Sequence, residues 1–144
     1  MSQSGYSIGR DTTVSVVLPD GTTLNFGKIT GFDSKQSTSE QEIPGLDGVT
    51  DHLRFYKGWT GDFMAERRGS DLDAYFSQLE ASYFAGRSEP YVTIQQTITE
   101  PNGQVSQFRF DNCVLKYDDA GSWAADKTVS QKVSFTASRR VKQA

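Results

Sequence analysis

The sequence has few of the residues that build disulfides, metal sites and membrane spans. Its 144 residues include one cysteine, Cys113, and one histidine, His52. A single cysteine cannot form an internal disulfide, which is consistent with folding in a reducing compartment. Because the chain has no Cys/His cluster with metal-ligand spacing, we expect neither a metal nor a cofactor. No apolar run approaches the roughly 20 residues of a membrane-spanning helix, so we expect no membrane insertion.

Positive charge is also scarce. The chain carries 15 Lys and Arg against 18 Asp and Glu, for a net charge of -3. A protein that binds nucleic acid electrostatically presents clustered Lys and Arg. The locally basic stretch lies at 139–144, and we interpret it as a solvated terminus. The first nine residues lack a basic end and an apolar core, so we expect no secretion signal there.

The residues that could support catalysis have simpler structural interpretations. The chain is short enough for one domain, which we place at 1–144. Asp71 and Asp73 suit the start of a helix, and Asp118 and Asp119 suit a turn. Cys113 lies in an apolar run, which favours a buried small hydrophobe over a reactive thiol. Without a paired histidine, a thiolate environment or a Gly-rich phosphate loop, we expect no enzyme.

Alternation of apolar and polar residues is the dominant pattern and predicts a mainly β fold. Turn residues bound each alternating run, with Pro19-Asp20-Gly21 in one turn and Pro101-Asn102-Gly103 in another. The predicted strands outside the central region are 12–18, 22–26, 91–98, 105–110, 112–117 and 128–138.

One segment has helical rather than strand spacing. Apolar residues recur every three or four positions between Ser70 and Phe84, which predicts a helix at 70–85. Ser70 can cap the first turn, and Gly86 is a natural stop. We expect Phe76 and Leu79 to pack this helix onto the sheet.

The central region, residues 28–67, predicts an unusually long β-hairpin. Residues 28–42 and 53–65 are both long alternating runs, and they meet at Ile43-Pro44-Gly45-Leu46-Asp47-Gly48-Val49. Thirteen residues at about 3.3 Å each give a ribbon of roughly 43 Å, long against usual strands. Leu53, Phe55 and Trp59 all stand at odd-numbered positions, which predicts that they lie on one face of the strand. The second half of 28–42 has no apolar residue, so the hairpin is expected to run past the domain's own core.

An arm of this kind needs something to lie against, because a free two-stranded ribbon is marginal in water. A mobile surface loop is one alternative. We favour docking on a neighbouring subunit, because the tip regains apolar residues. The expected contact residues are Glu40, Glu42, Ile43, Pro44, Gly45, Leu46 and Val49.

Taken in order, these elements resemble the tail tube proteins of contractile-tailed phages, relatives of R-type bacteriocin and type VI secretion tubes. The resemblance covers nearly the whole chain and is a pattern of elements and lengths rather than a chemical signature. It is carried by Gly58-Trp59-Thr60-Gly61-Asp62-Phe63, the helix ending at Gly86, Pro101-Asn102-Gly103, Phe108–Leu115, Gly121-Ser122-Trp123 and Val133–Arg139.

The resemblance implies a β-sandwich or β-barrel with one flanking α-helix, an N-terminal arm at 1–10 and an extended hairpin. It further implies hexameric rings of identical subunits, stacked into a hollow tube whose lumen conducts DNA passively. The implied partners are the tail sheath, baseplate and tape-measure proteins, in a virion tail assembled in the host cytoplasm. Asp33, Asp62 and Glu66 are our candidates for an acidic lumen wall.

Other functions remain open at this point. A β-sandwich binding module could use an aromatic platform of Tyr56, Trp59 and Trp123, although the parity of Trp59 favours a core or interface position. A baseplate or tube-end protein, or the tube of a DNA-free injection system, would share most of these features.

Overall fold

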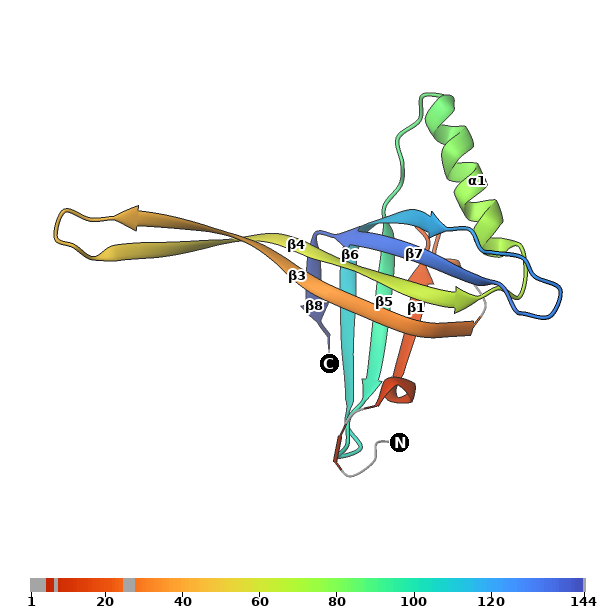
Figure 1. The fold of residues 1–144 in the computed structure, drawn as a ribbon, viewed down its shortest axis with the longest axis horizontal. Coiled ribbons are helices and arrows are strands. Elements are labelled where there is room, and N and C mark those ends of the chain that lie inside the picture. The colour runs from red at the N-terminus through yellow and green to blue at the C-terminus, as the bar shows by residue number, and fades with distance from the viewer. Residues whose placement is uncertain (1–4, 7, 25–27, 144) are drawn as a thin grey trace.

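The computed structural model describes residues 5, 6, 8–24 and 28–143, without the side chains of Arg10 and Lys28. It is mainly β, with one α-helix and a long extended hairpin, as the sequence predicts (Figure 1). In chain order the elements are the 3-10 turn η1 (Gly9–Asp11), β1 (Thr12–Val17), β2 (Thr23–Leu24), β3 (Lys28–Pro44), β4 (Thr50–Glu66), α1 (Asp71–Phe84), β5 (Val92–Thr99), β6 (Val105–Asp119), β7 (Ser130–Ala137) and β8 (Arg139–Lys142).

The strands form one antiparallel path in the order β2-β1-β5-β6-β7-β4-β3, with β8 paired to β6. β6 joins two layers, because its first half pairs with β5 and β8 and its second half pairs with β7. The change occurs near Asn112, which has a positive φ of 52°, a conformation in which asparagine is more frequent than most other non-glycine residues. Residues 105–110 and 112–117 are therefore one strand rather than two. Among the described residues the path stays open between β2 and β3, so the layers form a sandwich and not a closed barrel.

The core lies between the two layers and is built around aromatic rings. Phe32 stacks on Phe135 with centroids 5.7 Å apart, and Phe110 meets Phe135 edge-on at 5.4 Å. Cys113 is buried as expected, and burial raises the pKa of its thiol to about 12. The alternation of the last long strand is confirmed, because Val133, Phe135 and Ala137 are all buried.

The C-terminal region differs from the sequence interpretation. The predicted strand 128–138 corresponds to β7, and the basic stretch that follows forms a further strand, β8, which crosses to the other layer to pair with Phe108–Asp111. The basic stretch is thus an edge strand rather than a solvated tail, and Arg140 is half-buried. β6 also extends through Asp118 and Asp119, which were expected in a turn.

Two other expectations fall partly outside the described residues. Of the predicted strand 22–26, the structure places Thr23 and Leu24 in β2, and residues 25 and 26 are not described. The predicted N-terminal arm at 1–10 includes residues 1–4 and 7, which are likewise not described.

α1 lies beside the sandwich and projects away from it toward its C-terminal end (Figure 1). Leu72 in its first turn is buried, and Tyr75 and Phe76 pack partly against the core. Tyr83 in the last turn is 73 % exposed, so the apolar stripe predicted to pack on the sheet does so only at its beginning. Ser70 precedes the helix, but its side chain makes no capping hydrogen bond, contrary to expectation.

Candidate functional site

The long hairpin projects beyond the sandwich as a two-stranded ribbon (Figure 1). β3 and β4 pair along their whole length, from Lys28 opposite Glu66 to Pro44 opposite Thr50. β7 supports β4 only between Trp59 and Glu66. Residues 38–56, here called the arm, therefore have no third strand among the described residues. The predicted hairpin exists with nearly the predicted bounds, and its two strands run closer to the turn than the predicted runs 28–42 and 53–65.

Backbone hydrogen bonds close the end of the arm. The Gly45 amide donates to the Val49 carbonyl at 2.9 Å, and the Gly48 amide donates to the Gly45 carbonyl at 3.2 Å. The Asp47 carboxylate accepts from the Val49 amide at 3.0 Å. These bonds fix the turn and leave the Leu46 side chain fully exposed.

A β-bulge at the base of the arm decides which way its side chains point. Ser37 pairs with Gly58 and Thr38 pairs with Tyr56, so Lys57 is an extra residue on β4. Gly58 has φ 109°, in the region that favours glycine. An added Cβ would collide with the Ala137 carbonyl oxygen, so β7 passes too close for any side chain. A bulge shifts the alternation of the strand that carries it by one residue.

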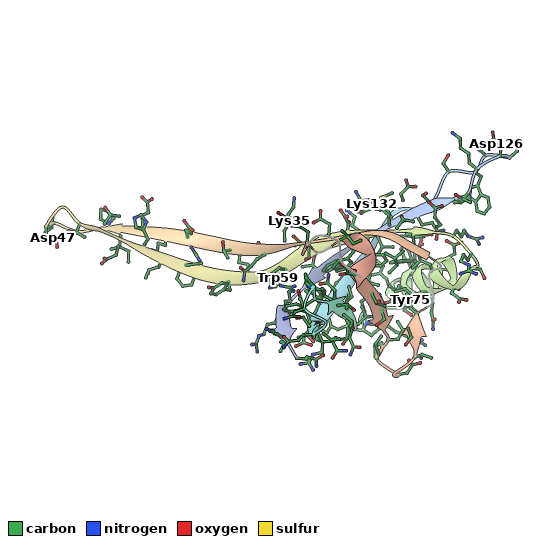
Figure 2. The ribbon with its side chains drawn as sticks, turned by 90° about the horizontal axis from the view of Figure 1, so that it is seen from below. Lys35, Asp47, Trp59, Tyr75, Asp126 and Lys132 are labelled. Carbon is green, nitrogen blue, oxygen red and sulfur yellow. The ribbon has the colours of Figure 1, made fainter. Side chains whose placement is uncertain are left out.

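The bulge corrects the predicted faces of β4. β3 has no extra residue at this point, so Ser39 and Gln41 keep the outer face of the sheet, which Lys35 also occupies. Their ladder partners, Phe55 and Leu53, share that face. Trp59 instead points to the core side, opposite Lys35 (Figure 2). Leu53 and Phe55 thus lie on the face opposite to Trp59, although all three share sequence parity.

The arm has two chemically different faces as a result. Its apolar face carries Ile43, Leu53 and Phe55, of which Leu53 is 42 % and Phe55 52 % exposed. Its charged face pairs Glu40 with Arg54 at 3.8 Å and Glu42 with His52 at 3.9 Å. Exposed ion pairs of this kind contribute little stability. The apolar face is therefore the part of the arm that would gain most from being covered.

The three acids predicted for a lumen wall lie together on the outer face of the sheet formed by β3, β4 and β7. Asp33 stands directly opposite Asp62, and Glu66 accepts a hydrogen bond from the Ser130 hydroxyl at 2.7 Å. Hydrogen bonds from Ser130 and Thr128 hold the pKa of Glu66 below its usual value.

Lysines share this outer face, which sequence reasoning missed. Lys132 lies 3.6 Å from the Asp62 carboxylate, and Lys116 lies 3.9 Å from Asp118. Ser134 stands between these ion pairs, opposite Asp62 and Lys116, and Thr136 follows it on the same face, opposite Thr60. The face thus interleaves both signs of charge with neutral polar groups, rather than presenting acids alone.

A groove lies at the base of the arm, where β8 passes below β4. It encloses about 420 Å³. We call it the arm-base groove, and its lining residues are Gln36, Tyr56, Gly58, Trp59, Ser138, Arg139 and Arg140. Tyr56 and Trp59, two of the three residues of the suggested aromatic platform, are brought together here. Trp123 lies elsewhere, with the Arg67 guanidinium 5.1 Å from its ring centre.

Arg140 is the most constrained charge in the arm-base groove. Its guanidinium lies 3.6 Å from the ring centre of Phe108 and 4.9 Å from that of Trp59. Burial lowers the pKa of this guanidinium from its ordinary value, although an arginine remains charged. Its Nε is shielded from solvent and bonds to none of the described residues. Nothing in the sequence pattern indicates this cluster, because the basic stretch that contains Arg140 predicts a solvated terminus.

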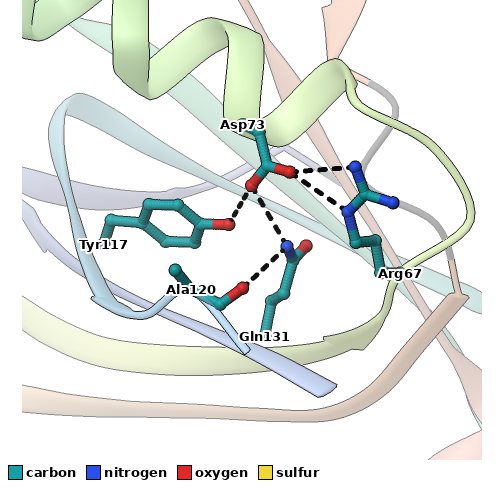
Figure 3. A network of polar contacts seen from close by, with 5 residues as sticks. All are labelled: Arg67, Asp73, Tyr117, Ala120 and Gln131. Atoms are coloured by element: carbon teal, nitrogen blue, oxygen red, sulfur yellow. Dashed lines mark hydrogen bonds and ion pairs between the residues drawn. The ribbon is translucent and has the colours of Figure 1, made fainter. Parts of the chain in front are cut away.

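A polar network fastens the beginning of α1 to the sheet (Figure 3). The Asp73 carboxylate accepts hydrogen bonds from Tyr117, from Gln131 at 3.2 Å and from Arg67 Nε at 3.1 Å. The Tyr117 hydrogen bond, followed by Arg67, holds the pKa of Asp73 below its usual value. Burial, together with Asp73, raises the pKa of Tyr117. This network holds the first turn of α1. Asp73 lies in that turn, as the sequence predicts.

Neither a metal-binding cluster nor a membrane-spanning helix is found in the part of the chain that the structure describes. Within residues 5–6, 8–24 and 28–143, no three His, Cys, Asp or Glu side chains gather into a metal site. Over the same residues, no helix is both long and apolar enough to cross a membrane.

Comparison with known proteins gives a likeness of fold. No model of a protein family matches the sequence, and no curated protein matches it. The chain is similar to one in a solved sheath/tube terminator of an extracellular contractile injection system, PVC, in its extended state. The TM-score is 0.69 at 14% identity, covering 99% of this chain and 100% of that one.

Two further solved assemblies contain similar chains. In the PVC sheath-tube complex in its extended state, the TM-score is 0.63 at 15% identity, covering 91% of this chain and 88% of that one. In the tail of an empty GTA particle with C6 symmetry, the TM-score is 0.58 at 13% identity, covering 96% and 100%. This chain therefore shares its fold with components of contractile injection systems and of the tail of a GTA particle.

Proposed function

We propose that this chain is a structural subunit of a contractile tail, which forms stacked hexameric rings around a lumen that conducts DNA passively. The projecting arm is the observation that carries this proposal. Exposed apolar side chains at its tip and along one face have nothing to cover them among the described residues of the chain. The likeness of fold to tube and tail components supports the same conclusion.

The chemistry of the sheet edges fits repeated assembly. The outer edge of β3 pairs with no other strand among the described residues. Unpaired strand edges recruit further strands, and a head-to-tail contact that does not close generates a filament. In this proposal the strand edges of the body join neighbouring copies within a ring. The arm reaches a copy in the adjacent ring and so stacks the rings.

The outer face that carries Asp33, Asp62 and Glu66 is our proposed lumen wall. Duplex DNA carries one negative charge per about 1.7 Å, and a wall rich in Lys and Arg would hold it by releasing counterions. Here Lys132 is matched by Asp62 and Lys116 by Asp118. Such a wall keeps DNA hydrated without binding it. In this proposal the sheath, baseplate and tape-measure proteins are the partners, and the assembled virion tail is the location.

Negative-stain microscopy of the purified protein tests the assembly. Wild-type protein is expected to form rings or tubes. A variant lacking Ile43–Gly48 is expected to stay folded, with an unchanged circular dichroism spectrum, and to remain monomeric, because the deletion removes the tip but not the sandwich. Normal tubes from the deletion variant would refute the role of the arm, and a wild type that stays monomeric at high concentration would refute the proposed function.

A gel-retardation experiment with duplex DNA tests the lumen. Assembled tubes are expected not to retard DNA at physiological salt, where screening acts over about 8 Å. A charge-reversed control, Asp33→Lys with Asp62→Lys, is expected to retard it. Retardation by the wild type would contradict a passive wall.

A tube terminator is the second candidate, favoured by the TM-score of 0.69 and the complete coverage of the matched chain in the PVC sheath/tube terminator structure. Microscopy separates the two, because a tube subunit elongates into tubes of variable length. A terminator forms single rings that do not stack.

A further inference from the structure

We propose that the arm-base groove is the receptor for the arm tip of a second copy of this chain. This inference rests on the proposed function, because it names the site at which one subunit receives the next. The arm tip is defined as residues 42–51, and the arm-base groove by the seven residues given above.

The two surfaces have complementary charge. The arm tip carries Glu42, Asp47 and Asp51 and contains no lysine or arginine. The arm-base groove carries Arg139 and Arg140, and no aspartate or glutamate is among its described lining residues. Opposite charges on two surfaces steer their encounter and fix their register.

The groove is also incomplete in the free chain. The Arg140 guanidinium is partly removed from water by Phe108 and Trp59, and ring faces offset only part of the cost of desolvating a cation. Its shielded Nε has no hydrogen-bond partner among the described residues. A carboxylate in the groove would supply the missing counter-charge, while Tyr56 and Trp59 would cover apolar tip residues.

The tip of the same chain cannot occupy this groove. From Ser37, which pairs with Gly58, to Gly45 the ribbon extends by about eight residues, or about 26 Å at 3.3 Å per residue. The ladder is continuous between these points, so the ribbon does not fold back (Figure 1). The occupant must therefore come from another copy. Such a contact is head-to-tail, and it leaves a free tip and a free groove at the two ends of any assembly.

Disulfide trapping tests the contact directly. In the Asp47→Cys, Ser138→Cys double variant, mild oxidation is expected to give a ladder of covalent oligomers on a non-reducing gel. Native Cys113 can stay in place, because its thiol is buried and its pKa is raised to about 12. The matched control is Asp47→Cys with Asp126→Cys, because Asp126 lies in a loop at the opposite end of the molecule (Figure 2). The control is expected to give no ladder.

Charge reversal tests the energetics. Arg139 is exposed, so Arg139→Glu is expected to leave the monomer folded and to raise the critical concentration for assembly about tenfold. Adding Asp47→Arg to it is expected to restore assembly, whereas Arg87→Glu, at an exposed arginine outside the groove, is expected to change nothing.

The outcomes separate this inference from the proposed function. Tubes that form normally with Arg139→Glu, together with no ladder from the cysteine pair, would refute the receptor site and leave the tube proposal intact. Wild-type protein that never assembles would refute the tube proposal itself. Loss of assembly with Arg139→Glu and no rescue by Asp47→Arg would mean that the groove receives something other than the tip, and would also refute the inference.

Discussion

Gly58 is the residue on which the direction of the arm depends. It combines a φ of 109° with a backbone approach to Ala137 that leaves no room for a side chain. The extra residue Lys57 beside it moves Leu53 and Phe55 to the outer face. The absence of a side chain at Gly58 permits the bulge, and the bulge determines on which face of the arm each side chain lies.

Replacing Gly58 with alanine is expected to destabilise the monomer by about 1–3 kcal/mol, because the backbone strain and the collision with β7 must be relieved. Urea denaturation measures this loss. Gly69→Ala is the matched control, because its added Cβ meets nothing within 4 Å and no positive φ is found there. Equal stability of the Gly58 variant and the wild type would show that the bulge is not constrained.

Asp73 makes stability depend on pH in a predictable direction. Its pKa is held below the ordinary 3.8 in the folded state, chiefly by the Tyr117 hydrogen bond. A depressed carboxyl pKa stabilises the fold fully above the unfolded pKa, and this stabilisation is lost as pH falls through the folded pKa.

We therefore expect the free energy of unfolding to fall below about pH 4, and to fall less in Asp73→Asn than in the wild type. Chemical denaturation at a series of pH values measures both slopes. Asp71→Asn in the same helical turn is the matched control, because Asp71 is exposed. Identical slopes for Asp73→Asn and the wild type would exclude Asp73 as the cause.

At the scale of elements, α1 is attached at its beginning and free at its end. Phe76 stacks on Tyr117 with ring centres 4.5 Å apart, while Phe84 is 77 % exposed. Leu79, Tyr83 and Leu115 line an open groove of about 710 Å³ between α1 and the sheet. The helix therefore adds little to the core beyond its first two turns.

Phe76→Ala is expected to cost about 2 kcal/mol, less than the about 3–5 kcal/mol of a fully buried phenylalanine. Phe76 is only half-buried, which is the reason for the smaller loss. A thermal melt measures it. Phe84→Ala is the control and should change stability by less than about 0.5 kcal/mol. A loss as large in the control would place the end of α1 in the core.

The arm is the element in which folding and assembly can be separated. Leu53 and Phe55 are exposed in the monomer, so Leu53→Ser with Phe55→Ser should leave the monomer's unfolding unchanged. The same variant should assemble only at higher protein concentration, because the covered apolar area is lost. Light scattering against concentration measures this. His52→Ser with Arg54→Ser changes the charged face instead and should shift assembly less.

At the scale of the whole molecule, stability should depend on protein concentration. Assembly binds the folded chain and not the unfolded one, so it raises the unfolding temperature by mass action. We expect the wild type to melt at a higher temperature than the variant lacking Ile43–Gly48, and the difference to vanish on dilution. Calorimetry over a range of concentrations checks this. A difference that persists in dilute monomers would mean that the arm tip stabilises its own subunit.

The sequence by itself determined the elements that depend on local pattern. Alternation identified the strands around Val133 and the two long runs of the hairpin, because burial of one sheet face imposes period two. Helical spacing identified α1, and Gly86 marked its end with a φ of 80°. The position of the hairpin turn was also predicted from the sequence, whereas the roles of the arm-tip residues and of the three acids stay predictions.

Only the tertiary structure decided how these elements face one another. The bulge at Gly58 arises because β7 passes against it, a contact between residues about 80 positions apart, and it reversed the predicted face of Leu53 and Phe55. Arg140 became part of a groove because β8 crosses to the other layer and pairs with Phe108–Asp111. Periodicity shows which residues of a strand share a face. Which of the two faces lies toward the core depends on partner strands that are distant in the sequence.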